Sequence, residues 1–216
     1  MVAESVRFTP FLLHGVTGSG KTEVYLRAAA AVIARHRQVL VLVPEIALTP
    51  QFIARIENTV GGRLVVLHSQ MSAGERHRAW WAAGAGLADV VLGTRLAVLA
   101  PFKALGLVIV DEEHDLSYKQ QDGFRYHARD VAVKRAQVAQ VPVVLGSATP
   151  SLESIANVHR GRYQLLSLPE RAGGAQMPRV RLLDLSTMPA AEGLSPPVVK
   201  ALARRLDRGE QSILYV

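Results

Sequence analysis

The sequence has 216 residues, of which 49% are hydrophobic and 20% are charged, and this balance excludes a disordered chain, a collagen and a coiled coil. It contains no cysteine, which also excludes a disulfide framework, a thiolate zinc site and a cysteine nucleophile. The 25 Lys and Arg outnumber the 18 Asp and Glu, for a net charge of +7, and this excess weakly favours a polyanionic partner.

Short apolar runs alternate with longer mixed segments along the chain. The runs are unbroken and rich in Val and Leu, as strands buried on both faces are, and they lie at residues 11–13, 39–43, 64–67, 90–92, 107–110, 143–145 and 213–216. The mixed segments predict helices at residues 22–36, 48–59, 73–85, 127–140, 151–159 and 198–208. This alternation predicts an α/β fold, with three layers built around a mainly parallel sheet.

Turn-forming residues gather between positions 169 and 197, among them Gly173-Gly174 and Pro196-Pro197. A possible strand, residues 180–185, lies inside this segment. One helix and one apolar run follow it, and a buried strand there would need neighbouring strands. We therefore expect residues 1–190 to form one domain, and residues 191–216 to supply a linker helix and the first strand of a second, truncated domain.

No apolar run approaches the roughly 20 residues of a membrane-spanning helix. The first ten residues carry Glu4 and Arg7 and lack the apolar core of a signal peptide. We therefore expect a cytoplasmic protein with no membrane partner.

The first functional motif, GVTGSGKT at residues 15–22, matches the P-loop pattern GxxxxGK[ST] at every position. A predicted strand precedes it and a predicted helix follows, so a chance glycine-rich turn is the weaker interpretation. Lys21 is expected between the β- and γ-phosphates of ATP, and the Thr22 hydroxyl on Mg²⁺. The predicted ATP-binding residues are Gly15, Val16, Thr17, Gly18, Ser19, Gly20, Lys21 and Thr22.

The second motif, DEEH at residues 111–114, directly follows an apolar strand. Ligands of open α/β sheets bind outside the carboxyl ends of the strands. Asp111 is therefore expected to support Mg²⁺, through water, and Glu112 to polarise the attacking water. An acidic turn after a core strand is the alternative, and the upstream P-loop disfavours it.

The third motif, GSATPS at residues 146–151, also follows an apolar strand. Its small hydroxyl residues suit the N-cap of the helix that begins near Leu152. They also suit a functional segment at a strand end, and the two interpretations are compatible.

In this order, the three motifs resemble those of superfamily 2 helicases of the DExH type. In them, the segment that matches Ser147, Ala148 and Thr149 couples the ATP site to movement. His114 joins Lys21, Asp111 and Glu112 as a catalytic residue by the same resemblance, as a link from the nucleotide to Ser147 and Thr149.

Further segments narrow the resemblance to the primosomal replication-restart helicases of the PriA family. They are GVTGSGKTEVYL (15–26), VPEIALTPQ (43–51), GTR (93–95), YKQQ (118–121) and FRYHARD (124–130). This resemblance runs from about Phe8 to the end of the chain. It implies the first RecA-like lobe of a P-loop NTPase that uses ATP and Mg²⁺, unwinds DNA 3′ to 5′ and acts with primosome proteins.

The resemblance implies DNA contacts at two strand ends, one at Pro44, Glu45 and Thr49 and the other at Thr94 and Arg95. Hydroxyls, cations and main-chain N–H groups at strand ends are common donors to phosphate. The alternatives are a helix cap for Thr49 and a solvated charge for Arg95.

Residues 118–129 interleave aromatic rings with cations, a mixture that suits single-stranded DNA because bases stack on the rings and cations hold phosphates. The matching loop of PriA-like and RecQ-like helicases couples DNA contact to ATP hydrolysis. Rings that pack on the core are the alternative, and we also expect Trp80 and Trp81 to belong to the core. The predicted DNA contacts of the loop are Tyr118, Lys119, Phe124, Arg125, Tyr126 and Arg129.

Several features of the resembled family are missing from the sequence. No glutamine that could read adenine precedes Gly15, no cysteine cluster is present to hold zinc, and no residue matches an arginine finger of a second lobe. Two classes of function therefore stay open, an ATP-driven motor lobe and a nucleotide- or DNA-binding module without turnover. A small-molecule kinase is disfavoured because it has no use for the second and third motifs.

Overall fold

The computed structural model describes residues 7–172, 179–187 and 193–215. The chain divides into two compact units, Met1–Ala175 and Gln176–Val216. The first unit ends before the boundary expected at residue 190, because its last strand, β9 (Gln164–Leu168), already completes the sheet edge.

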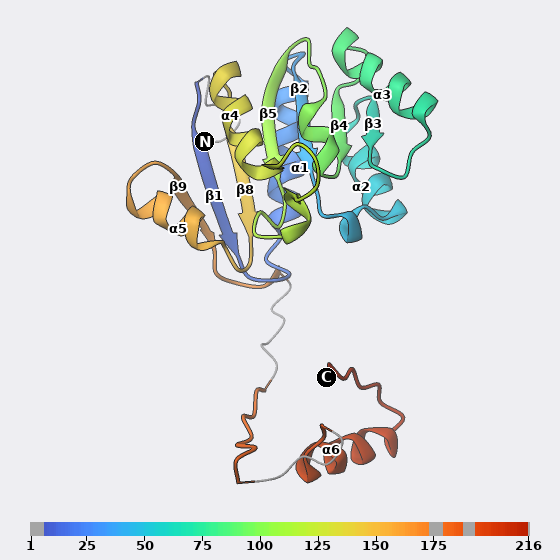
Figure 1. The fold of residues 1–216 in the computed structure, drawn as a ribbon, viewed down its shortest axis with the longest axis vertical. Coiled ribbons are helices and arrows are strands. Elements are labelled where there is room, and N and C mark those ends of the chain that lie inside the picture. Colours follow the sequence, from blue (N-terminus) through green and yellow to red (C-terminus); the bar gives the residue numbers. More distant parts are fainter. Residues whose placement is uncertain (1–6, 173–178, 188–192, 216) are drawn as a thin grey trace. The chain divides into compact units, whose positions relative to one another are not determined.

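A seven-stranded sheet forms the centre of the first unit, in the order β3-β4-β2-β5-β8-β1-β9 (Figure 1). Every neighbouring pair in it is parallel, so the predicted α/β class is confirmed. The other strands are β1 (Pro10–Gly15), β2 (Gln38–Leu42), β3 (Leu64–Leu67), β4 (Val90–Gly93), β5 (Leu105–Val110) and β8 (Val143–Ser147).

Helices cover both faces of this sheet. They are α1 (Lys21–Ile33), α2 (Pro50–Val60), α3 (Ala73–Ala85), α4 (Ala128–Ala139) and α5 (Leu152–His159). Three short 3₁₀ helices, η1 (Glu45–Ala47), η2 (Arg95–Leu99) and η3 (Leu116–Tyr118), and a small hairpin, β6 (Lys119–Gln120) and β7 (Tyr126–His127), fill the connections.

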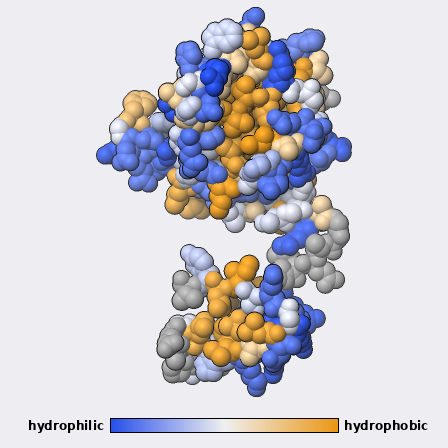
Figure 2. Space-filling view, turned by 90° about the vertical axis from the view of Figure 1, so that its right-hand side faces the viewer, coloured by the Kyte–Doolittle hydropathy of each residue, from blue (hydrophilic) through white to orange (hydrophobic). Residues whose placement is uncertain are grey.

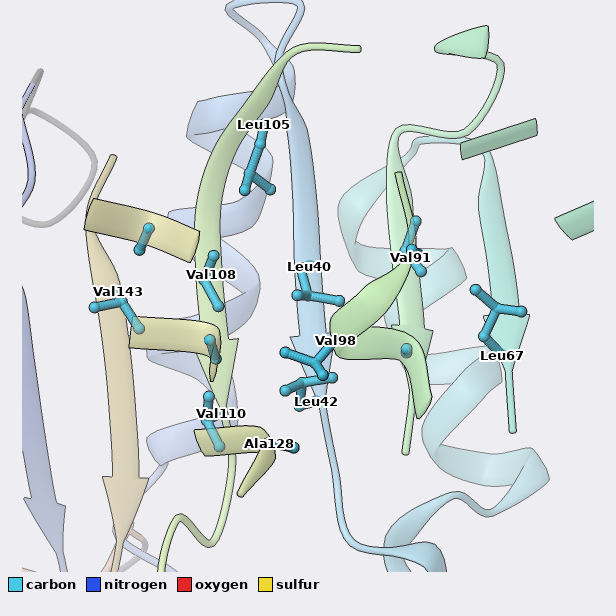
Figure 3. Close-up of a cluster of buried hydrophobic side chains, with 14 of the residues drawn as sticks. Leu40, Leu42, Leu67, Val91, Val98, Leu105, Val108, Val110, Ala128 and Val143 are labelled. Carbon is cyan, nitrogen blue, oxygen red and sulfur yellow. The ribbon is translucent and has the colours of Figure 1, made fainter. Parts of the chain in front are cut away.

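Two buried apolar clusters explain why the predicted strands read as unbroken apolar runs. Leu40 and Leu42 of β2 join the cluster that packs under α3 and α4 (Figure 3). Val39 and Val41 belong to the cluster on the other face, under α1 and α2. Because successive side chains of a strand point to opposite faces, a strand with helices on both sides buries both sets of side chains and is read in the sequence as an unbroken apolar run.

The sequence does not reveal β9 in this way. It is the last strand of the sheet, and its residues Gln164, Leu165 and Ser167 are exposed. Polar residues at its exposed positions interrupt the apolar ones, so no unbroken apolar run marks it, whereas β3 at the other edge of the sheet is less exposed and is apolar throughout.

The right-hand side of the first unit in Figure 1, where β3 and α3 lie, faces the viewer in Figure 2. This face shows a hydrophobic strip between hydrophilic borders. On α3, Trp80 packs against the core whereas Trp81 is 61% exposed. Neighbours on a helix point about 100° apart, so our expectation that both rings belong to the core is wrong for Trp81.

In the second unit, α6 (Pro196–Leu206) confirms the predicted helix to within two residues. The strands predicted at 180–185 and 213–216 are wrong, since the described residues 180–185 and 213–215 have no strand. Leu182 is 92% exposed and Ile213 is 98% exposed, whereas strands of the predicted kind are buried. Among the described residues, no helix is both long and apolar enough to span a bilayer.

Gln38, at the start of β2, is a buried polar residue whose amide group is fully paired. Its Nε2 donates to the carbonyl oxygens of Ala83 at 2.9 Å and Ala88 at 2.7 Å. Its Oε1 accepts from the N–H groups of Lys103 at 2.9 Å and Ala104 at 3.0 Å. One side chain thereby joins the end of α3 to the segment that enters β5.

Replacement of Gln38 by Leu should lower the free energy of unfolding by about 3 kcal/mol, because four main-chain groups, two of them in buried hydrogen bonds, lose a partner. Urea unfolding measures this. The matched change Gln51→Leu, at an exposed position of α2, should cost less than about 0.5 kcal/mol. Equal losses in the two variants would contradict the structural role of Gln38.

Candidate active site

The three motifs lie at the carboxyl ends of adjacent strands. β1 leads into the P-loop, β5 into the acidic motif and β8 into the GSATPS segment (Figure 1). β8 lies between the other two strands, and His14 of β1 is level with Ser147 of β8. Parallel pairing therefore gathers residues that are more than 100 positions apart in the sequence.

The P-loop connects β1 to α1 through two glycines in the left-handed region, Gly18 at φ 78° and Gly20 at φ 89°. Only glycine adopts such a backbone without a steric cost. The N-terminus of α1 follows at Lys21, so unpaired N–H groups and the positive end of the helix dipole face the loop. This arrangement binds anions.

The chain returns to the P-loop after β9. The N–H of Val16 donates to the Leu168 carbonyl at 3.3 Å, and the N–H of Ala172 donates to the Gly18 carbonyl at 2.8 Å. The segment that leaves the sheet is thus hydrogen-bonded to the loop at two points.

A pocket of about 370 Å³ opens over the loop. The structure brings most of the predicted ATP-binding residues and both acids into its lining, which consists of Thr17, Gly18, Ser19, Gly20, Lys21, Thr22, Arg55, Asp111, Glu112 and Ala172. Sequence analysis missed Arg55 of α2, because no motif marks it. Its guanidinium lies 4.0 Å from the Glu23 carboxylate.

Lys21 is a buried lysine in the lining of this pocket. Its Nζ donates to the Gly15 carbonyl at 2.9 Å and lies 3.9 Å from Oε1 of Glu112. An ammonium group has three donors, so two remain for oxygens of an anion.

Asp111 is held by neighbours on two sides. Its Oδ1 accepts from the Tyr25 hydroxyl at 3.0 Å and from the Glu112 N–H at 3.0 Å, which leaves Oδ2 for another partner. Burial raises the pKa of Asp111, and the charge of Glu112 raises it further. A cation bound here would relieve both penalties.

The oxygens of Thr22 and Asp111 are the hard donors that Mg²⁺ prefers, and both residues line the pocket. The buried hydroxyl of Ser19, in the same loop, has no hydrogen-bond partner among the residues that the structure describes. The residues present therefore fit the nucleotide and Mg²⁺ expected from the sequence.

Glu112 has a left-handed backbone, with φ 43°. This conformation costs a non-glycine residue on the order of 1 kcal/mol or more. It turns the carboxylate back between Lys21 and His114, whose Nδ1 lies 3.7 Å from Oε2 of Glu112.

His114 joins the acidic motif to the third motif. Its Nδ1 lies 2.8 Å from the Ser147 hydroxyl, and its Nε2 lies 3.3 Å from the Thr149 hydroxyl. The Thr149 N–H donates to Ser147 Oγ at 2.9 Å. The three residues form one hydrogen-bonded group, and Ala148 lies between the two hydroxyl residues in the sequence. Their role in coupling stays a prediction.

Sequence analysis missed Tyr25, which is 3% exposed and lies one helical turn after Lys21. Burial and the nearby Asp111 raise its pKa well above the ordinary value, so the hydroxyl stays a donor to Asp111. A Cβ atom at Gly146 would lie 1.5 Å from the Tyr25 hydroxyl. Only glycine fits at position 146, because the Tyr25 hydroxyl occupies the space that a Cβ atom would take.

Arg129 does not face solvent, and our prediction that it contacts DNA is corrected here. It is 8% exposed, and its guanidinium donates to the fully buried Glu113 carboxylate at 3.0 Å and to Ser151 Oγ at 2.8 Å. Glu113 also accepts from the Ser151 N–H at 2.7 Å and from the Ser154 hydroxyl at 2.9 Å. A buried charge requires such partners, so Arg129 is occupied.

The prediction that Tyr118 contacts DNA is likewise corrected. It is fully buried, and its hydroxyl donates to the Asp111 carbonyl at 2.7 Å. The alternative of a ring packed on the core is the right one here. Tyr118 thus supports the turn that carries the acids.

The remainder of the aromatic and cationic loop stays accessible. Lys119 and Arg125 are exposed, Phe124 is 84% exposed, and the half-buried Tyr126 ring lies 6.2 Å from the Phe124 ring. The guanidinium of Arg95 donates to the carbonyls of Ser117 and Lys119, both at 3.0 Å. Arg95 therefore anchors the base of the loop and is not a solvated charge.

The other predicted DNA contacts differ in exposure. Pro44 and Thr94 are buried, although Thr94 lines a surface pocket together with Glu45, and their contacts with DNA stay predictions. Glu45 and Thr49 are exposed. Thr49 is the N-cap of α2 and accepts from the Phe52 N–H at 3.2 Å, as the alternative required.

The chain matches the family model of the DEAD/DEAH box helicases over residues 5–158. It belongs to the DEAD/DEAH box helicase family. It is 46% identical over 209 residues to the replication restart protein PriA of Haemophilus influenzae and 45% identical to that of Bacillus subtilis. The two matches include 97% and 95% of this chain. They span only 29% and 26% of the length of the two relatives.

Solved structures agree with this family. RecG bound to a three-way DNA junction matches 77% of this helicase chain at a TM-score of 0.56 and 26% identity, over 21% of the RecG chain. The Hef helicase domain of Pyrococcus furiosus matches 77% of the chain and 36% of its own at a TM-score of 0.52 and 22% identity, which shows the fold alone. The predicted RecA-like helicase lobe is confirmed.

The contact between Tyr25 and Gly146 predicts a paired effect on stability. Gly146→Ala should lower the free energy of unfolding by more than about 2 kcal/mol, because the added methyl group overlaps a packed ring. Gly74→Ala, in α3 with its nearest atom 3.6 Å away, should be neutral or stabilising.

The double variant Tyr25→Phe/Gly146→Ala should regain part of the lost stability, since removal of the hydroxyl leaves the next ring atom 2.7 Å from the added Cβ. Chemical denaturation of the parent protein, the two single variants Tyr25→Phe and Gly146→Ala and the double variant completes the double-mutant cycle. Strict additivity would show that the two positions do not meet.

Proposed function

We propose that this helicase chain is the ATP-binding motor lobe of a DNA helicase that moves 3′ to 5′ in replication restart. One observation carries the proposal: the P-loop and the acidic pair line one pocket, and the His114–Ser147–Thr149 group adjoins Glu112, in a chain that is 46% identical to a PriA protein. DNA and primosome proteins are its proposed partners, and the cytoplasm its proposed location.

Each residue of the pocket has a part in the proposed reaction. The P-loop N–H groups and Lys21 bind the phosphates of ATP. Thr22 and Asp111 hold Mg²⁺, which neutralises charge on the phosphates when bound. Glu112 orients the attacking water and accepts its proton.

The accessible loop supplies the proposed DNA contact. Exposed Lys119, Phe124 and Arg125 offer cations for phosphates and a ring for a base. The loop runs directly into α4, where Arg129 binds Glu113, the neighbour of Glu112. We propose that DNA contact reaches the catalytic carboxylate along this short path.

A specific observation also supports a second candidate, a binding module without turnover. Among the described residues that line the pocket, Arg55 is the one arginine, and it already lies near Glu23. An arginine aimed at the transferred phosphate contributes roughly 10³–10⁵ in rate. The isolated chain is therefore expected to bind ATP and to hydrolyse it slowly, whether or not single-stranded DNA is present.

Lys21→Ala should weaken ATP binding by about 10- to 150-fold, the equivalent of the roughly 1.5–3 kcal/mol of a charged hydrogen bond. Isothermal titration calorimetry of the 216-residue chain measures it. Lys200→Ala, at an exposed position of α6, removes the same charge and should leave the affinity unchanged. Equal affinity of Lys21→Ala and the parent protein would refute the P-loop assignment.

Substitutions of the two acids should have different effects in a protein extended to the length of its PriA relatives. Glu112→Gln should leave binding of ATP with Mg²⁺ nearly intact and abolish DNA-stimulated hydrolysis. Asp111→Asn should weaken the binding that depends on Mg²⁺. Glu57→Gln, at an exposed position of α2, is the matched control, and near-normal turnover by Glu112→Gln would overturn the assignment.

The same extended protein tests the direction of movement. It should displace a strand from a duplex with a 3′ single-stranded tail and leave the 5′-tailed duplex intact. The reverse preference would refute the proposed polarity while leaving the nucleotide site in place.

A further inference from the structure

Tyr25 is a buried residue of α1 whose one polar side-chain atom faces the acidic motif. It follows Lys21 by four positions and Thr22 by three. Residues three and four positions apart lie on the same side of a helix, so Tyr25 shares the side of α1 that carries two residues of the nucleotide pocket. Its hydroxyl donates to Oδ1 of Asp111 at 3.0 Å.

The Tyr25 ring is held in one place by its surroundings. It belongs to the buried apolar cluster under α1 and α2, together with Leu13, Ile109 and Val144 of three adjacent strands. On the side of β8, a Cβ atom at Gly146 would lie 1.5 Å from the hydroxyl oxygen and 2.7 Å from Cζ. The hydroxyl therefore cannot turn to another partner unless the strand or the helix moves.

The contact with Tyr25 limits the rotation of the Asp111 carboxylate. An aspartate side chain rotates broadly about its last bond when nothing holds it. Here two donors meet the same oxygen, because Oδ1 accepts from the Tyr25 hydroxyl and from the Glu112 N–H, both at 3.0 Å. Within the described residues both side-chain hydrogen bonds of Asp111 are to Oδ1, so Oδ2 is the oxygen that remains for a cation or its water.

A second buried tyrosine, Tyr118, holds a different part of Asp111. Its hydroxyl donates to the Asp111 main-chain carbonyl at 2.7 Å, so a neutral acceptor is sufficient to pair a buried hydroxyl at this point of the fold. The Tyr25 hydroxyl meets a carboxylate instead, and a buried carboxylate is costly. The cost is explained by what the carboxylate binds and not by the need of the hydroxyl for a partner.

We propose that Tyr25 is a positioning residue for Mg²⁺: its hydroxyl fixes the Asp111 carboxylate relative to Thr22, so that both residues hold the same ion. The inference rests on the proposed function, in which Thr22 and Asp111 hold Mg²⁺. One side chain of α1 thereby ties the helix that carries Thr22 to the end of β5. Tyr25 is not among the described residues that line the pocket, so it acts through Asp111 and not by contact with the nucleotide.

Calorimetric titration of the 216-residue chain with ATP tests this inference, once in excess MgCl₂ and once in EDTA. The dissociation constant in EDTA divided by that in MgCl₂ is the magnesium gain. Tyr25→Phe keeps the ring and should lower the magnesium gain at least about fivefold, or about 1 kcal/mol. The affinity in EDTA should change less than about twofold, because Lys21 and the P-loop N–H groups are untouched. A loss of stability alone would lower both affinities equally and leave the ratio unchanged.

Two further variants separate a positioning role from a general effect. Tyr163→Phe removes a tyrosine hydroxyl that is hydrogen-bonded to the Asn157 side chain, outside the described pocket lining, and should change the magnesium gain less than about twofold. Asp111→Asn should remove most of the gain. In the Asp111→Asn background, Tyr25→Phe should change it less than about twofold, because the hydroxyl has lost the carboxylate through which it acts.

The outcomes distinguish this inference from the proposed function. A magnesium gain that Asp111→Asn removes but Tyr25→Phe leaves intact would overturn the inference and keep the proposed metal site. Equal effects of Tyr25→Phe in the parent and in the Asp111→Asn background would also overturn it. A parent protein without a magnesium gain, or a gain that survives Asp111→Asn, would refute the proposed role of Asp111 and the inference with it.

Discussion

The buried carboxylate of Glu113 is the interaction on which the arrangement of the active site depends. It has no exposed surface, and its four hydrogen bonds come from Arg129, Ser151 and Ser154. These donors belong to the start of α4 and the start of α5, so one charge ties two helices to the acidic turn. Removal of one partner from a buried ion pair typically costs about 3–5 kcal/mol. Glu113 thus holds the backbone from which Glu112 and His114 project.

A second constraint is the space that Tyr25 needs. Its hydroxyl reaches Asp111 only because Gly146 carries no side chain. The first turn of α1, the acidic motif and the third motif therefore meet at one point. A motif that reads as three short sequence patterns is, in space, a single packed unit, and a change in one part alters the fit of the others.

The sequence predicted much of this architecture because local physics specifies it. Strands covered on both faces leave unbroken apolar runs, and the P-loop has a fixed spacing that its strand and helix confirm. The predictions from the sequence were wrong where contacts between residues far apart in the chain decide whether a side chain is buried. Tyr118 and Arg129 have the composition of a DNA-binding loop, yet their partners Asp111 and Glu113 bury them. Edge strand β9, Tyr25 and Arg55 left no pattern in the sequence, and the described residues 213–215, where a strand was expected, form none.

The hydrogen bonds that join the P-loop to the segment after β9 have a mechanical meaning. Val16 is bonded to Leu168, and Ala172 to Gly18, and the chain then continues into the second unit at residue 176. A tension applied along the chain from that side is borne first by these bonds, before it reaches the strands. The phosphate-binding loop is therefore the place where the first unit holds the outgoing chain, and a pull on Ala172 acts directly on Gly18 of the loop.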